Sequence, residues 1–217
     1  MSLLINDIAP DFKSDSTVGV INFHKWIGDS YAVLFSHPKD FTPVCTTEFS
    51  AVAKLSQEFK NRNTKVIGVS VDGNDEHHGW IKDIESLSSI EVTFPIIDDT
   101  SLTVSKLYEM FPADSYLPDG RTAFHSATVR TVFIIGPDKK IRLTFSYPMA
   151  VGRNFTEILR VLDAIQLSDK HNIATPANWV IGQDIIVPTS ISDEDALKKF
   201  GSIEKKLSYL RFTSQPK

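Results

Sequence analysis

The sequence predicts an α/β fold in which helices flank one central mixed sheet. Short apolar runs typical of buried strands alternate along the chain with longer segments of helical periodicity. With 217 residues, of which 41% are hydrophobic, the chain can bury a full core without internal disulfides. We therefore expect one large domain over residues 1–167 and a smaller C-terminal arm over residues 168–217.

The first half of the chain alternates strand and helix. Residues 31–36 form an apolar run before Pro38, as in a buried strand, and 65–71 form another. Between them, apolar side chains recur near a period of about 3.6 residues, which predicts one helix over 43–60. The remaining elements expected here are a helix over 75–88 with Asp75 as its N-cap, an extended piece over 94–98 and a short helix over 101–108.

The second half contains a predicted hairpin. Residues 128–135 and 141–147 are apolar runs joined by a tight Gly-Pro-Asp turn, so they are expected to pair antiparallel. Residues 110–127 show no period and are expected to be a surface loop. A helix over 154–167 follows the hairpin, and the arm then holds a strand-like run over 184–188 and a polar helix over 193–200.

Composition and charge exclude several function classes. The net charge of −4 argues against a nucleic-acid-binding protein, and the charge of the arm is nearly balanced. No apolar stretch approaches the ~20 residues of a membrane span, and the start lacks the pattern of a signal peptide. A single cysteine indicates a reducing compartment, so we expect a cytoplasmic protein. We expect neither a metal nor a cofactor.

Cys45 is the only cysteine, and it lies where the predicted helix begins. The N–H groups and the dipole of a helix N-terminus favour a thiolate. Because the chain cannot close an internal disulfide, this sulfur must complete its chemistry with another molecule. A free cysteine is often only a small buried hydrophobe. Its neighbours here are threonines, a proline and a glutamate, which favours the reactive interpretation.

The residues before Cys45 suit a reactive sulfur. Thr42 lies three residues earlier, and its hydroxyl can both donate and accept hydrogen bonds. Pro38 and Pro43 stiffen the loop and remove backbone donors. The pattern Pro38-x-x-x-Thr42-x-x-Cys45 resembles the active-site motif of the peroxiredoxins, and residues 41–48 resemble their one-cysteine, peroxiredoxin-six-type subclass. Similar segments follow in the same order at 132–140, 147–148, 152–160 and 174–179.

The resemblance covers essentially the whole chain and is least clear over 110–127. It implies a thioredoxin-like fold and a thiol peroxidase that reduces hydrogen peroxide and organic hydroperoxides through a cysteine sulfenic acid. Such an enzyme serves antioxidant defence and redox homeostasis. With no second cysteine, recycling would need an external thiol, from glutathione, thioredoxin or a glutaredoxin. The resemblance also implies a homodimer to which the arm contributes.

The resemblance implies a role for each matching residue. Cys45 would be the peroxidatic cysteine, Thr42 would hold the peroxide, and Arg130 would stabilise the thiolate and the leaving oxyanion. Without the resemblance, Arg130 is a charge in an apolar strand, and such charges are generally paired or functional. The supporting residues implied are Pro38, His37, Glu48 and Arg153, the last two as a pair that fixes the arginine.

A lipase-like triad is the weaker hypothesis. The family is also credited with a phospholipase activity, and the aligned positions are Ser30, His24 and Asp138. The segment from Gly28 to Ala32, however, lacks the second glycine that lets a nucleophile elbow turn sharply.

Three other functions compete with the peroxidase. A disulfide oxidoreductase would need a second cysteine where Thr42 stands. A cysteine hydrolase would need a histidine base, for which His37, His24 or His125 could be proposed. A non-catalytic holdase would use an exposed apolar surface and an ordinary thiol.

Overall fold

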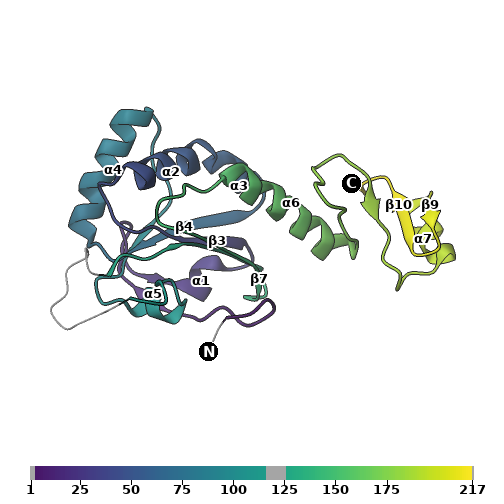
Figure 1. The fold of residues 1–217 in the computed structure, drawn as a ribbon, viewed down its shortest axis with the longest axis horizontal. Helices are drawn as coiled ribbons and strands as arrows, with labels where there is room; N and C mark the ends of the chain where they lie inside the picture. The colour runs from purple at the N-terminus through teal and green to yellow at the C-terminus, as the bar shows by residue number, and fades with distance from the viewer. Residues whose placement is uncertain (1–2, 116–125, 217) are drawn as a thin grey trace. The chain divides into compact units, whose positions relative to one another are not determined.

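A five-stranded mixed sheet organises the N-terminal part of the chain (Figure 1). The computed structural model describes residues 3–115 and 126–216. The strands lie in the order β5-β4-β3-β6-β7, with β3, β4 and β5 parallel and β6 antiparallel to both neighbours. Their bounds are β3 Tyr31–Ser36, β4 Thr64–Ser70, β5 Ile96–Asp98, β6 Arg130–Ile135 and β7 Ile141–Tyr147. The predicted mixed sheet and hairpin are confirmed.

Helices cover both faces of this sheet, as Figure 1 shows. One face carries α2 (Pro43–Lys54), α3 (Ser56–Asn61) and α4 (Asn74–Ser88), and the other carries α1 (Phe23–Ile27) and α5 (Thr103–Leu107). Side chains alternate along β3: Phe35 packs on Phe49 of α2, whereas Leu34 belongs to the cluster that includes Phe23 of α1. The sheet therefore separates two apolar layers.

The structure corrects two predicted helices. The single helix expected over 43–60 is broken at Leu55, whose N–H is shared between the carbonyls of Ala51 and Val52, so that α2 and α3 are separate. The helix expected from Asp75 begins one residue earlier, with Gly73 as its N-cap. Asp98 of the neighbouring strand accepts from the N–H of Asn74 at 3.1 Å, a tertiary contact that local sequence does not reveal.

Other differences lie outside the predicted elements. Strands β1 (Lys13–Ser14) and β2 (Ile21–Asn22) pair antiparallel before α1, and none of the three was expected. In the predicted surface loop 110–127, Met110 is buried and its carbonyl accepts from Val129, which corrects that end of the loop. Residues 116–125 of the same loop lie outside the described residues.

The chain divides into two compact units, Met1–Phe155 and Thr156–Lys217. The second holds most of α6 (Phe155–His171) and a three-stranded sheet in the order β8-β10-β9. Its remaining elements are β8 Ile185–Ile186, α7 Asp193–Phe200, β9 Glu204–Leu207 and β10 Leu210–Thr213. Trp179 and Ile185 lie in a small core of this unit. The predicted domain boundary after residue 167 stays a prediction.

Among the helices of the two described ranges, none combines the length and the apolarity that a membrane crossing requires.

Candidate active site

Cys45 lies in the first turn of α2 and is fully buried. The turn follows from the local sequence. Thr42 is the N-cap in an extended conformation, and Pro43 occupies the first helical position, where its fixed φ suits the helix and its missing N–H costs nothing. The N–H groups of Val44 and Cys45 have no partner within the helix, because helix geometry leaves the first turn unpaired. They are therefore donors beside the sulfur.

The loop that leads into this turn is conformationally strained. Phe41 has a φ of 54°, a left-handed conformation that costs a non-glycine residue on the order of 1 kcal/mol. The hydroxyl of Thr42 donates to the carbonyl of Lys39 at 2.9 Å, and its carbonyl accepts from Thr46. Pro38 is buried in the same loop. The loop thus fixes the backbone that carries Thr42 and Cys45.

Arg130, at the start of β6, reaches the sulfur. Its Nη1 lies 3.3 Å from Cys45 Sγ and 2.7 Å from Glu48 Oε2, while its Nε donates to the carbonyl of Met149 at 2.8 Å. Glu48 lies three residues after Cys45, so both side chains project from adjacent positions on α2. The guanidinium is therefore held at three points, one of which is the sulfur.

Arg153 fixes Glu48 from the other side. Its Nε donates to Glu48 Oε1 at 2.9 Å and its Nη2 to Oε2 at 2.7 Å, and Nη1 donates to the carbonyls of Ser36 and Thr131. We call Cys45, Glu48, Arg130 and Arg153 the arginine cluster. Burial acts to raise the pKa of Glu48, but the hydrogen bonds and charge of Arg153 outweigh it and hold that pKa below its ordinary value of 4.5. Glu48 is therefore a carboxylate.

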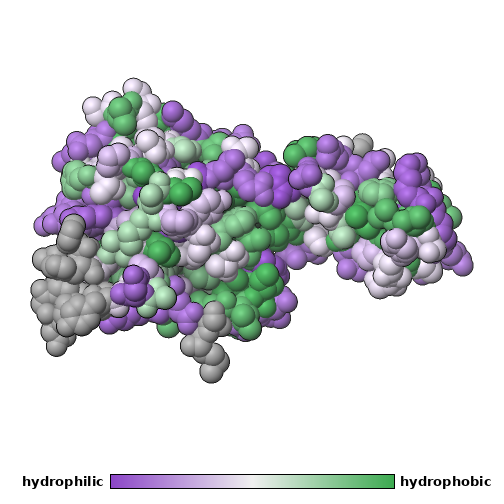
Figure 2. Space-filling view, viewed as in Figure 1, coloured by the Kyte–Doolittle hydropathy of each residue, from purple (hydrophilic) through white to green (hydrophobic). Residues whose placement is uncertain are grey.

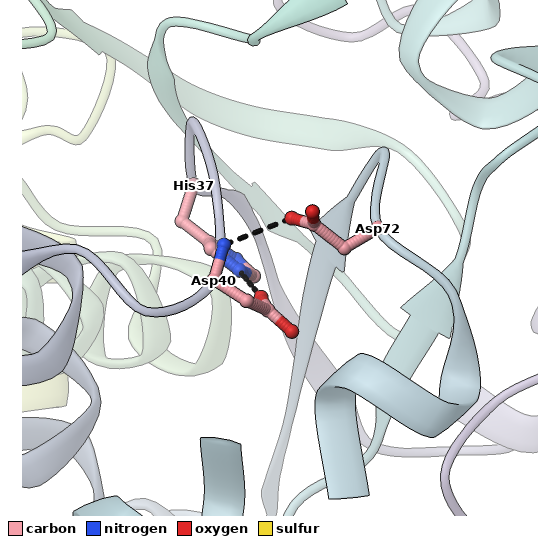
Figure 3. Close-up of side chains that lie close together, drawn as sticks. All are labelled: His37, Asp40 and Asp72. Atoms are coloured by element: carbon pink, nitrogen blue, oxygen red, sulfur yellow. Dashed lines mark hydrogen bonds and ion pairs between the residues drawn. The ribbon is translucent and has the colours of Figure 1, made fainter. Parts of the chain in front are cut away.

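His37, the other predicted supporting residue, is buried in a second cluster. Its Nε2 lies 2.6 Å from Asp40 Oδ1, and Asp40 Oδ2 lies 2.6 Å from Nδ1 of His77 on α4. The backbone N–H of Asp40 donates to Asp72 at 2.8 Å (Figure 3). We call His37, Asp40, Asp72 and His77 the histidine cluster.

Sequence reasoning missed three of the four members of the histidine cluster. His77 lies 40 positions from His37, on another element, and no local spacing joins them. The short interval from His37 to Asp40 was the one available signal.

The three residues of the lipase-like triad take separate partners. Ser30 donates to Asn63 Oδ1 at 3.1 Å, Nε2 of His24 lies 2.7 Å from the carbonyl of Ala9, and Asp138 pairs with Arg142 at 3.1 Å. Within the described part of the chain, no hydrogen bond joins two of the triad residues. The phospholipase hypothesis stays a prediction without geometric support. His125, a possible hydrolase base, lies outside the described residues.

Comparison with known proteins identifies the family. The model of the AhpC/TSA family matches residues 5–144, and that of the C-terminal domain of 1-Cys peroxiredoxin matches residues 164–202. Mitochondrial peroxiredoxin PRX1 of Saccharomyces cerevisiae is 52% identical over 97% of this chain and 80% of its own length. Peroxiredoxin-6 of Homo sapiens is 44% identical over 99% of this chain and 98% of its own.

Solved structures agree. A structure of yeast mitochondrial 1-Cys peroxiredoxin is 51% identical, with a TM-score of 0.89 over 98% of this chain and 99% of that one. A mutant of Peroxiredoxin 6 of Arenicola marina is 41% identical, with a TM-score of 0.92 over the whole of both chains. Together with a single cysteine at the start of α2, these matches show that the chain belongs to the AhpC/TSA family, as a thiol peroxidase of the one-cysteine peroxiredoxin type.

Proposed function

We propose that Cys45 is the residue of this peroxidase that attacks the peroxide, and that Arg130 is its electrostatic partner. The supporting observation is the 3.3 Å contact between Arg130 Nη1 and Cys45 Sγ. The arginine cluster holds two guanidinium cations and one carboxylate, so it carries one uncompensated positive charge in a buried place. Uncompensated buried charge is costly, and a thiolate at Cys45 balances it.

The chemistry follows from this charge balance. The thiolate attacks the terminal oxygen of a hydroperoxide, an S–O bond forms as the O–O bond breaks, and the alkoxide or hydroxide leaves with the electron pair. Arg130 and the free N–H groups of the first turn of α2 stabilise the negative charge that develops on the oxygens. Thr42 holds the peroxide through its hydroxyl. The product is a sulfenic acid on Cys45 and an alcohol or water.

An external thiol completes the cycle. It condenses with the sulfenic acid to a mixed disulfide and water, and a second thiol then releases Cys45 as a thiol. The yeast mitochondrial relative resolves its thiol via glutathione/thioredoxin systems, and we propose the same class of reductant here. Because Cys45 is fully buried, the first turn of α2 must open before a reductant reaches the sulfur.

We also propose that the protein is a cytoplasmic homodimer. β7 is an edge strand, and among the described residues its start is paired with the N-terminal segment, through Asn6 and Asp7. Open edges favour pairing with another chain. Exposed apolar side chains also occur in both units, among them Met149, Val151 and Tyr209, and Figure 2 shows such residues interspersed with polar ones. A monomeric mass by light scattering at micromolar concentration contradicts the dimer.

Stopped-flow mixing with one equivalent of hydrogen peroxide tests the assignment. We expect the wild type to form a sulfenic acid rapidly, Cys45→Ser to form none while keeping its circular dichroism spectrum, and Arg130→Ala to react far more slowly. Steady turnover is then measured with glutathione and with thioredoxin as alternative reductants. Peroxide reduction retained in Cys45→Ser overturns the proposal, as does oxidation of wild-type Cys45 at the rate of an ordinary thiol, which a holdase would show.

A further inference from the structure

Asp40 lies between two buried histidines. Its two carboxylate oxygens face one ring each, His37 Nε2 and His77 Nδ1, both at 2.6 Å. All three side chains are at most 1% exposed. Figure 3 shows His37 and Asp40 facing each other, with the backbone nitrogen of Asp40 directed at Asp72. This geometry determines where the protons of the pair must be.

His77 requires two protons. Its Nδ1 faces Asp40 Oδ2, and its Nε2 lies 3.1 Å from the backbone carbonyl of Ile97. Both partners are acceptors, and a neutral imidazole has an N–H on only one nitrogen. Only the imidazolium donates to both. His77 is therefore the cation of the cluster, paired with Asp40.

His37 requires only one proton. Its Nε2 donates to Asp40 Oδ1, whereas its Nδ1 is buried and accepts or donates no hydrogen bond within the described residues. A proton on Nδ1 would create a buried donor without an acceptor. It would also add a second positive charge beside Asp40, which the His77 cation already neutralises. A bare Nδ1 costs less than both together. His37 is therefore neutral, with a bare Nδ1.

The electrostatic balance agrees with this assignment. Burial lowers the pKa of His37, and the hydrogen bond that His37 donates to Asp40, with the charge of Asp40, only partly opposes it. Burial also acts to lower the pKa of His77, but the hydrogen bond and charge of Asp40 outweigh it and raise that pKa above 6.5. Among the described residues, the charged or titratable groups that act most on His77 include Asp40, Asp72 and His37, from the loops after β3 and β4.

A metal ion is the competing interpretation of the cluster. One atom each of His37, Asp40 and Asp72 lies within 4.8 Å of the others, a spacing that would suit a cation. Both oxygens of Asp40 and one oxygen of Asp72, however, already have partners: Asp40 accepts from both histidines, and Asp72 Oδ2 accepts from the N–H of Asp40 and the hydroxyl of Ser70. These bonds would have to be broken to bind an ion, so the geometry favours proton sharing.

The cluster contacts the helix that holds Cys45. The ring of His37 lies edge-on to Phe49 of α2 at 4.6 Å and stacks on Trp80 of α4 at 5.0 Å. Trp80 donates to the hydroxyl of Thr46, the residue after Cys45, at 3.0 Å. Any change in the charge of His37 therefore occurs next to the first two turns of α2.

We propose that His77 is a positioning residue of the peroxidase, which holds the shared proton of the histidine pair through Asp40 and keeps His37 neutral beside α2. The expected effect on the oxidation of Cys45 rests on the proposed function, whereas the proton assignment does not. Arg130 then remains the cation in contact with the sulfur across the pH range in which His77 is charged.

Two substitutions separate the charge of His77 from its hydrogen bonds. In His77→Asn the amide nitrogen takes the place of Nδ1 and still donates to Asp40; in His77→Gln it takes the place of Nε2 and donates to Ile97. Both remove the cation, so in both we expect His37 to acquire the second proton, as the remaining base next to Asp40. The matched control is His78→Gln, an exposed neighbour on the same helix.

Imidazole nitrogen NMR of the ¹⁵N-labelled full chain at neutral pH gives the first measurement. In the wild type we expect two protonated nitrogens on His77 and a bare Nδ1 on His37; in both His77 variants, the His37 Nδ1 signal shifts to that of a protonated nitrogen. The control leaves it unchanged. A neutral His77 or a doubly protonated His37 in the wild type overturns the proposal without any variant, and independently of peroxidase activity.

The pH profile of Cys45 oxidation by hydrogen peroxide gives the second measurement. We expect both His77 variants to show an added ionisation step, absent in the wild type and in His78→Gln, at the pH where His37 titrates by NMR. If His77 acted only through its hydrogen bond to Asp40, His77→Asn would show the pH profile of the wild type. That result also overturns the proposal.

Discussion

Two buried clusters near the start of α2 share one arrangement: in each, one carboxylate contacts two basic side chains. In the arginine cluster, Glu48 lies between Arg130 and Arg153, and in the histidine cluster, Asp40 lies between His37 and His77. The bases make the difference. A guanidinium keeps its proton at any pH that a folded protein tolerates, whereas an imidazole titrates near neutrality. The first cluster therefore holds a fixed charge at the sulfur, and the second can change its charge.

The two clusters meet at the end of β3. The carbonyl of Ser36 accepts from Arg153, while the next residue, His37, turns its side chain to Asp40. One short stretch therefore serves both clusters, the first through a backbone carbonyl and the second through a side chain. The sulfur thus lies beside a charge that does not respond to pH and close to a pair that does.

Breaking the arginine cluster should have the largest effect. Glu48→Leu leaves two buried guanidinium groups without their carboxylate, and we expect the free energy of unfolding to fall by about 3–5 kcal/mol. Urea unfolding measures the change. Glu58→Ala, which removes the exposed pair with Arg62, is the control and should cost less than about 1 kcal/mol. Equal losses in the two variants would show that the cluster contributes no more than a surface ion pair.

Replacing the cation at the sulfur should affect rate more than stability. Arg130→Lys keeps the charge but cannot reach Cys45, Glu48 and the carbonyl of Met149 together. We expect sulfenic acid formation to slow by about 10²-fold, the usual cost of losing one transition-state donor. Arg153 contacts Glu48 but not the sulfur, so Arg153→Lys should slow sulfenic acid formation less. A larger loss in Arg153→Lys would reverse the roles of the two arginines.

The sequence predicted the arginine cluster better than the histidine cluster. Cys45 and Glu48 lie one helical turn apart, and a charge at position 130 in an apolar strand stood out by itself. Signals of this kind are visible in a short stretch of sequence. The bond between Asp40 and His77 depends on the packing of α4 against α2, a long-range contact that no window of sequence contains. The same limit explains the cap of α4 by Asp98.

The two clusters should also differ in how they respond to pH. The lowered pKa of Glu48 means that its stabilisation is complete above the ordinary pKa of 4.5 and is lost as pH falls through the folded value. The raised pKa of His77 means that its stabilisation is complete below 6.5 and is lost as pH rises through the folded value. His37, whose pKa is lowered, loses stabilisation as pH falls below 6.5.

Unfolding free energies between pH 4 and 9 measure these slopes, each at most about 1.4 kcal/mol per pH unit for one proton. The two histidines should make the unfolding free energy greatest near pH 6.5. A separate loss is expected at acidic pH, where Glu48 becomes protonated. In His77→Gln, where we expect His37 to take the second proton, the loss of stability below pH 6.5 should disappear. If that loss remained in the variant, His37 would not have gained the proton.

The smallest expected effect tests the link between the clusters. Trp80 stacks on His37 and donates to Thr46, so Trp80→Phe keeps an aromatic ring against His37 but removes the hydrogen bond and some buried volume. We expect the lost hydrogen bond to contribute about 0.5–1.5 kcal/mol of the destabilisation, with faster amide hydrogen exchange confined to the first turn of α2. Trp179→Phe is the matched control, because Trp179 also donates one hydrogen bond, to Gln183 in the C-terminal unit.

If this bond restrains the opening of α2, it also affects the cycle. The sulfenic acid on Cys45 must be exposed before an external thiol can reach it, so a looser first turn should speed the reduction of the sulfenic acid by glutathione. The attack on peroxide depends on Arg130, which Trp80→Phe leaves in place, and should change little. Faster reduction with unchanged oxidation would identify Trp80 as a restraint on opening, whereas a change in oxidation alone would assign it to the reacting geometry of the sulfur.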